Sequence, residues 1–194
     1  MTVYSELDLI GEYLETTKRT FFERVVRNFF SDDKVKEIEF TLSKVTYLRI
    51  ITYSQVISRS ADIEFGPGEL IKVIIHHYIK NYFTYNNTKR YAELLKEDSG
   101  SSRGYSIIDH TANTKYFIEN KVRDSKYKIK LSFDKEVLLK GEVLLAEIDE
   151  IHTVRSTLEE FTAVILTDYV NRSRKLSEAK IVREVKKILE NVYG

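Results

Sequence analysis

The chain has 194 residues, of which 42% are hydrophobic and 31% charged, with one Pro, seven Gly and no Cys. This composition excludes collagen-like and low-complexity classes and indicates a chain that folds. Without Cys, disulfides, thiolate zinc sites, iron–sulfur clusters and thiol nucleophiles are all ruled out. Lys and Arg number 31 against 30 Asp and Glu, so the net charge of +1 creates no overall attraction to nucleic acid or anionic lipid.

The sequence contains no run of about 18 apolar residues of the kind that spans a membrane. Its first residues, Met1 to Glu6, also lack the basic and then apolar pattern of an export signal. We therefore expect a cytoplasmic protein that makes no membrane contact. A chain of this length can enclose one core, which predicts a single domain over residues 1–194 with a possible internal boundary at the polar stretch 97–104.

A long first helix is predicted from Ser5 to Phe30, because apolar residues recur there with a helical period. Ser5 and Asp8 resemble a capping box at its start. Three further apolar residues, Phe22, Val26 and Phe30, widen the stripe beyond one packing face. The helix is therefore either enclosed by the core on two sides or presents a second face to a partner. We favour a surface that a partner protein, or a second copy of the chain, would cover.

Residues 36–58 fit two structures. The stretch from Val45 to Ile57 is rich in β-branched and aromatic residues, which favours strands, although apolar residues in the same region also fit a helical stripe. We expect strands. The breaker Gly66–Pro67–Gly68 is followed by a helical stripe that predicts a helix from about Glu69, and a short helix is expected around residues 91–96.

A four-stranded antiparallel meander is predicted over residues 105–151, because apolar and polar residues alternate with the two-residue period of strands. Its strands are expected at residues 105–109, 116–122, 126–133 and 143–149. A capping box at Ser156 and Glu159 then opens a C-terminal helical hairpin. The expected fold is α+β, with the meander packed against the N-terminal helices and this hairpin.

One motif suggests catalysis. Asp109 is followed ten residues later by Glu119-Asn120-Lys121, and carboxylates with a Lys on neighbouring strands can hold Mg²⁺ and position a water. These three residues resemble the PD-(D/E)xK nuclease pattern. Ile108, however, stands where that pattern has Pro, and the Glu-x-Lys strand is expected to continue into another hairpin strand instead of a crossover helix.

Lys126, Lys128 and Lys130 form a basic stripe on the predicted meander that could bind an anion such as a phosphate backbone. The expected register places Glu147 beside Lys128 and Asp149 beside Lys126, which favours a charge-compensated surface.

Basic and aromatic residues also interleave from His76 to Tyr91, a pattern that can stack single-stranded nucleic acid. Three of them, Tyr78, Tyr82 and Tyr85, continue an apolar stripe and are expected in the core with their hydroxyls at its rim. Adjacent histidines on a helix diverge, so no metal site is expected at His76 and His77.

These observations favour a non-enzymatic protein that binds another macromolecule, such as a regulator, inhibitor, immunity factor or structural adaptor of bacterial or phage type. The expected partner is another protein or a second copy of the chain, and no cofactor or metal is expected. A metal-dependent nuclease using Asp109, Glu119 and Lys121 is one alternative. An RNA- or DNA-binding module is another.

Overall fold

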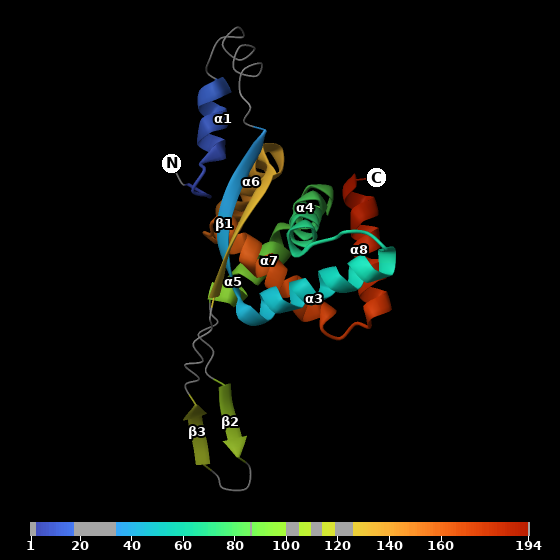
Figure 1. The fold of residues 1–194 in the computed structure, drawn as a ribbon. Coiled ribbons are helices and arrows are strands. Elements are labelled where there is room, and N and C mark those ends of the chain that lie inside the picture. The colour runs from blue at the N-terminus through green and yellow to red at the C-terminus, as the bar shows by residue number, and fades with distance from the viewer. Residues whose placement is uncertain are drawn as a thin grey trace.

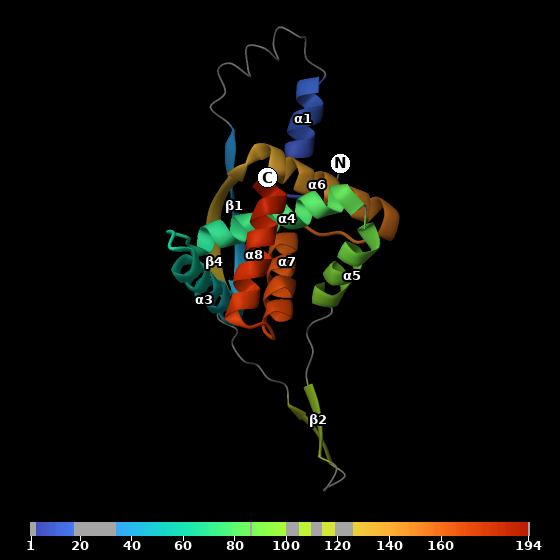
Figure 2. The same ribbon diagram turned by 90° about the vertical axis from the view of Figure 1, so that its right-hand side faces the viewer.

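The computed structural model describes residues 3–17, 34–85, 87–99, 105–109, 114–118 and 126–193. In chain order the elements are α1 (Leu9–Thr17), β1 (Val35–Ser43), α3 (Lys44–Ala61), α4 (Pro67–Tyr85), α5 (Thr88–Ser99), β2 (Tyr105–Asp109), β3 (Thr114–Ile118), β4 (Lys126–Asp134), α6 (Lys135–His152), α7 (Leu158–Ser173) and α8 (Glu178–Tyr193). Strands β1 and β4 form a long two-stranded ribbon, which lies to the left of α3, α4 and α8 in Figure 1. In Figure 2, turned by 90° so that the right-hand side of Figure 1 faces the viewer, α8 and α7 lie nearer the viewer than the ribbon.

The predicted four-stranded meander is wrong. Among the described residues the strands form two separate antiparallel pairs, β2 with β3 and β4 with β1, so the strand at 126–134 pairs across the chain with 35–43. The pairing follows side-chain chemistry, because Ile129 and Phe133 are buried beside the apolar residues of β1 while the lysines of β4 face its glutamates. The fold remains broadly α+β but is mostly helical.

The predicted fourth strand is helix α6. Asp134 caps this helix by accepting a hydrogen bond from the Glu136 amide at 2.8 Å. Buried residues then recur at helical spacing through Leu138, Leu144, Leu145 and Ile148. Leu144 and Leu145 are both buried, whereas neighbouring residues of a strand would point to opposite faces.

The expectation of strands over residues 36–58 is correct only up to Ser43. There the Ser43 hydroxyl accepts a hydrogen bond from the Thr46 amide at 3.1 Å and starts helix α3. Buried Ile50, Tyr53 and Ile57 continue that helix at intervals of three and four residues. Burial of this stripe outweighs the strand preference of its β-branched and aromatic residues.

Most other helix predictions are confirmed, including the start of α4 beside Gly66–Pro67–Gly68 and the C-terminal hairpin α7–α8. The capping box of α7 lies one residue later than predicted, at Thr157 and Glu160. Helix α1 begins at Leu9, and residues 18–30 of the predicted long first helix lie outside the described residues. No helix in the described part of the chain is both long and apolar enough to cross a bilayer.

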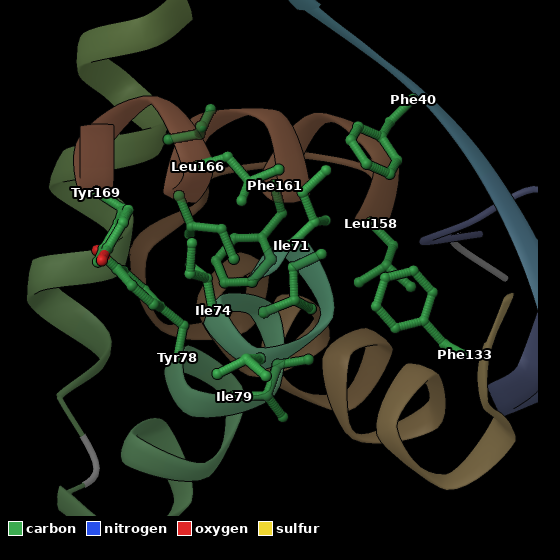
Figure 3. Close-up of a cluster of buried hydrophobic side chains, with 14 of the residues drawn as sticks. Phe40, Ile71, Ile74, Tyr78, Ile79, Phe133, Leu158, Phe161, Leu166 and Tyr169 are labelled. Atoms are coloured by element: carbon green, nitrogen blue, oxygen red, sulfur yellow. The ribbon is translucent and has the colours of Figure 1, made fainter. Parts of the chain in front are cut away.

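The core lies between the ribbon and the helices. Phe40 of β1 and Phe133 of β4 point from the ribbon towards Leu158 at the start of α7 (Figure 3). Ile74 of α4 and Phe161 of α7 are buried deeper between the helices. Close packing at Gly141 brings α6 against α7, since a Cβ atom there would lie 2.6 Å from a Leu158 methyl group.

A buried carboxyl group fastens the N-terminal segment to α6. Glu142 has no exposed surface, and its oxygens accept hydrogen bonds from the Leu9 amide at 3.1 Å, the Ile10 amide at 2.8 Å and the Ser5 hydroxyl. The two amides belong to the first turn of α1, where backbone N–H groups have no partner within the helix. Glu142 therefore caps α1 from a different helix.

Glu142→Ala should destabilise the protein by about 3 kcal/mol or more, because three buried or part-buried donors lose their acceptor. Urea unfolding would measure the loss. Glu136→Ala, a change on the exposed side of the same helix, is the matched control and should leave the unfolding midpoint almost unchanged. Equal midpoints for the two variants would show that Glu142 has no capping role.

Candidate binding groove at a free strand edge

Among the described residues β1 pairs with β4 alone, which leaves its other edge without a strand partner. The Lys135 amide donates to the Lys34 carbonyl at 2.9 Å, which makes this pair a hydrogen-bonded pair of the ladder. Hydrogen-bonded and non-hydrogen-bonded pairs alternate along an antiparallel ladder. Counting from Lys34 in steps of two, the backbone N–H and C=O groups of Phe40 and Leu42 face β4, while those of Glu39 and Thr41 face away from it. None of the described residues forms a backbone hydrogen bond to Glu39 or Thr41 from that side. We call this side the free edge.

A groove of about 1110 Å³ runs beside the free edge. One wall is β1 from Glu39 to Ser43, and the other is formed by residues 154–157, the start of α7 and the N-terminal residues Val3, Ser5 and Glu6. Two of the lining side chains, Leu95 and Val164, are almost fully buried and apolar. The groove therefore combines unpaired strand backbone with an apolar floor.

Hydrogen bonds hold the wall opposite β1 in place. The Leu158 amide donates to the Tyr4 carbonyl at 2.7 Å, and the Glu6 amide donates to Glu159 at 3.3 Å. In the same wall, the Thr157 and Glu160 side chains form the capping box of α7. Because Ser5 also donates to Glu142, this wall is tied both to α7 and to α6.

Acidic side chains dominate the groove. Its lining includes the carboxylates of Glu6, Glu39, Glu159 and Glu160 and two cationic side chains, Lys126 and Arg155. Arg155 already lies 3.5 Å from Asp149. Four carboxylates against two cations give the lining an excess of negative charge, although one carboxylate, Glu39, is itself paired with Lys128 and the chain as a whole carries a charge of +1.

The predicted basic stripe is paired with β1. Lys128 lies 2.8 Å from Glu39 and Lys130 lies 2.6 Å from Glu37, and these hydrogen bonds lower the pKa of each Glu carboxyl. The third residue, Lys126, lines the groove. The sequence predicts that Glu147 and Asp149 compensate these lysines, but both residues belong to α6. There Glu147 accepts a hydrogen bond from the Tyr82 hydroxyl, and Asp149 accepts one from the Tyr4 hydroxyl.

Five of the other predicted site residues lie outside the described residues: Phe22, Val26, Phe30, Glu119 and Lys121. Asp109 ends β2 and pairs with Thr114 of β3. Sequence reasoning missed the groove, because it depends on which strand pairs with β1. The alternation of Glu37 and Glu39 with Ile38 and Phe40 is the signal that could have identified β1 as an acidic strand.

The aromatic and basic segment from His76 to Tyr91 forms a second polar cluster. The Tyr78 hydroxyl donates to Asp168 at 2.7 Å and accepts from Arg172, whose Nη2 lies 2.9 Å from Asp168. The Tyr91 hydroxyl donates to the Tyr78 carbonyl at 2.9 Å. These groups satisfy one another beside a pocket of about 260 Å³, so the cluster fastens α4, α5 and α7 together.

Two of the three tyrosines expected in the core are there. Tyr78 and Tyr82 are buried, and their hydroxyls reach Asp168 and Glu147, as predicted for hydroxyls at the rim. Tyr85 is 74% exposed, because it is the last residue of α4. Within the described ranges, no three His, Asp or Glu side chains are arranged to hold a metal ion.

No protein family model, curated protein or solved structure matches this chain.

Amide exchange should alternate along β1. The amides of Phe40 and Leu42 face β4 and should exchange at least about tenfold more slowly than those of Glu39 and Thr41, which face the groove. Exchange followed by NMR on the folded protein measures each amide separately. Equal protection of all four amides would contradict the assignment of the free edge.

Tyr91→Phe should reduce the loss of stability at alkaline pH. Burial raises the pKa of Tyr91 from 10.0 to about 12, so the unfolded chain releases this proton at lower pH than the folded protein does. The resulting stabilisation is complete below pH 10 and is lost as the pH rises through 12, a change of about 2–3 kcal/mol for this group. Urea midpoints across this range test it, with the exposed Tyr85→Phe as the control. Identical pH profiles for wild type and Tyr91→Phe would refute it.

Proposed function

We propose that the protein is a non-enzymatic binding protein that takes up an extended segment of another protein along the free edge of β1. The observation that carries the proposal is the row of outward backbone groups at Glu39 and Thr41 within a groove. An extended peptide can pair with an unpaired strand edge and so add a strand to the sheet. Main-chain hydrogen bonds then supply affinity, and side-chain pockets supply specificity.

The surroundings of the edge support this role. Proteins usually protect an exposed strand edge, since it can pair with any other chain. Here the edge lies within walls that are fixed by hydrogen bonds to α6 and α7. A walled edge admits a single extended segment more readily than a whole sheet. The cytoplasmic location expected from the sequence stays part of this proposal.

Peptides selected from a displayed random library against the full chain would provide ligands for the test. Thr41→Pro removes the outward N–H group and should weaken these peptides at least about tenfold, since one edge hydrogen bond is lost and the ring crowds the added strand. Thr41→Val keeps that N–H and is the matched control. Anisotropy titrations would measure both affinities.

A second measurement does not depend on how Thr41→Pro folds. Methylating the backbone nitrogens of a selected peptide one at a time should block binding at alternate positions only, because an added strand directs every second N–H to β1. Binding that is insensitive to every methylation and to Thr41→Pro would disprove strand addition.

A further inference from the structure

We infer that the segment bound at the free edge is an extended strand in which Lys or Arg alternates with apolar residues, the pattern of β4 itself. The inference rests on the proposed function and names the chemistry of the partner. It follows from the groove lining and from the strand that β1 already binds on its other side.

The alternation follows from strand geometry. A strand added beside β1 would place every second side chain on the inner face, next to Phe40 and Leu42 and above the apolar floor that includes Val164. Its remaining side chains would point outward beside Glu39 and Thr41, which are exposed. Apolar residues therefore suit the inner positions and polar residues suit the outer ones.

The charge of the outer positions follows from the groove walls. Glu39 stands on one wall and Glu6 and Glu159 on the other, so a cation between them has carboxylates on both sides. Lys128 occupies one oxygen of Glu39, and a carboxylate has acceptor sites for further donors. The cations of the lining, Lys126 and Arg155, are fewer than its carboxylates.

Strand β4 already pairs with β1 in this pattern. On the paired edge, Lys128 and Lys130 meet Glu39 and Glu37 while Ile129 and Phe133 enter the core. A second copy of β1 fits the groove less well, because its own exposed residues at 37 and 39 are glutamates and would meet Glu39. The charge pattern therefore favours a basic partner strand over self-pairing through β1.

A synthetic peptide with the sequence of residues 126–133 is the natural probe, tested against the full chain by fluorescence anisotropy. We expect it to bind at least about tenfold more tightly than the same peptide carrying Lys126→Glu, Lys128→Glu and Lys130→Glu, and to weaken as salt is raised. A scrambled peptide of equal composition, which keeps the charge and loses the alternation, should bind as poorly as the charge-reversed one.

Protein variants locate the contact. Glu6→Gln should weaken the basic peptide about threefold or more, whereas Glu136→Gln, a matched change on α6 outside the groove lining, should leave its affinity unchanged. Amide exchange of the complex should show new protection at Glu39 and Thr41 with protection at Phe40 and Leu42 retained.

Three results would overturn the inference: equal binding of the charge-reversed peptide, equal binding of the scrambled peptide, or loss of the native β4 pairing, which would indicate strand exchange. Each can occur while library-selected peptides still depend on Thr41, in which case strand addition stands and only the partner's chemistry is wrong. If no peptide responds to Thr41→Pro or to backbone methylation, the proposed function itself fails.

Discussion

The buried carboxyl group of Glu142 determines where the N-terminal segment lies. It accepts hydrogen bonds from two first-turn amides of α1 and from the Ser5 hydroxyl, at a point in α6 that is closed to solvent. Burying a carboxyl group costs free energy unless its oxygens accept hydrogen bonds. The N-terminal segment and α6 therefore stabilise each other. Ser5 and Glu6 also line the groove, and the interior of the protein thereby fixes one wall of the candidate site.

Local patterns in the sequence were sufficient to predict the helices α4, α7 and α8, because apolar stripes run along them and a breaker marks the start of α4 and a capping box that of α7. They also identified 126–133 as a strand. They failed where two structures share one pattern: Leu144, Ala146 and Ile148 alternate as in a strand, yet the equally apolar Leu145 shows that the stripe is helical. In α3, the cap at Ser43 and the buried stripe outweigh β-branched composition.

The candidate site could not be predicted, since it depends on a pairing between segments far apart in the chain. Lys128 and Glu39 are 89 residues apart, and no turn signal connects their strands. The predicted meander instead places the lysines of β4 beside Glu147 and Asp149 and gives β1 no partner. Complementary charge does join two segments of this protein, but it joins β4 to β1 and not to residues 143–149.

The same separation affects the protein while it is being made. A ribosome adding about 5–20 residues per second needs roughly 5–20 s to extend the chain from β1 to β4. During that interval both edges of β1 lack a strand, and its acidic, alternating sequence is available to any basic extended segment nearby. Among the described strands, β1, which forms the proposed recognition edge, has the longest interval before its partner is synthesised. Synthesis is therefore the stage at which a competing strand has most access to it.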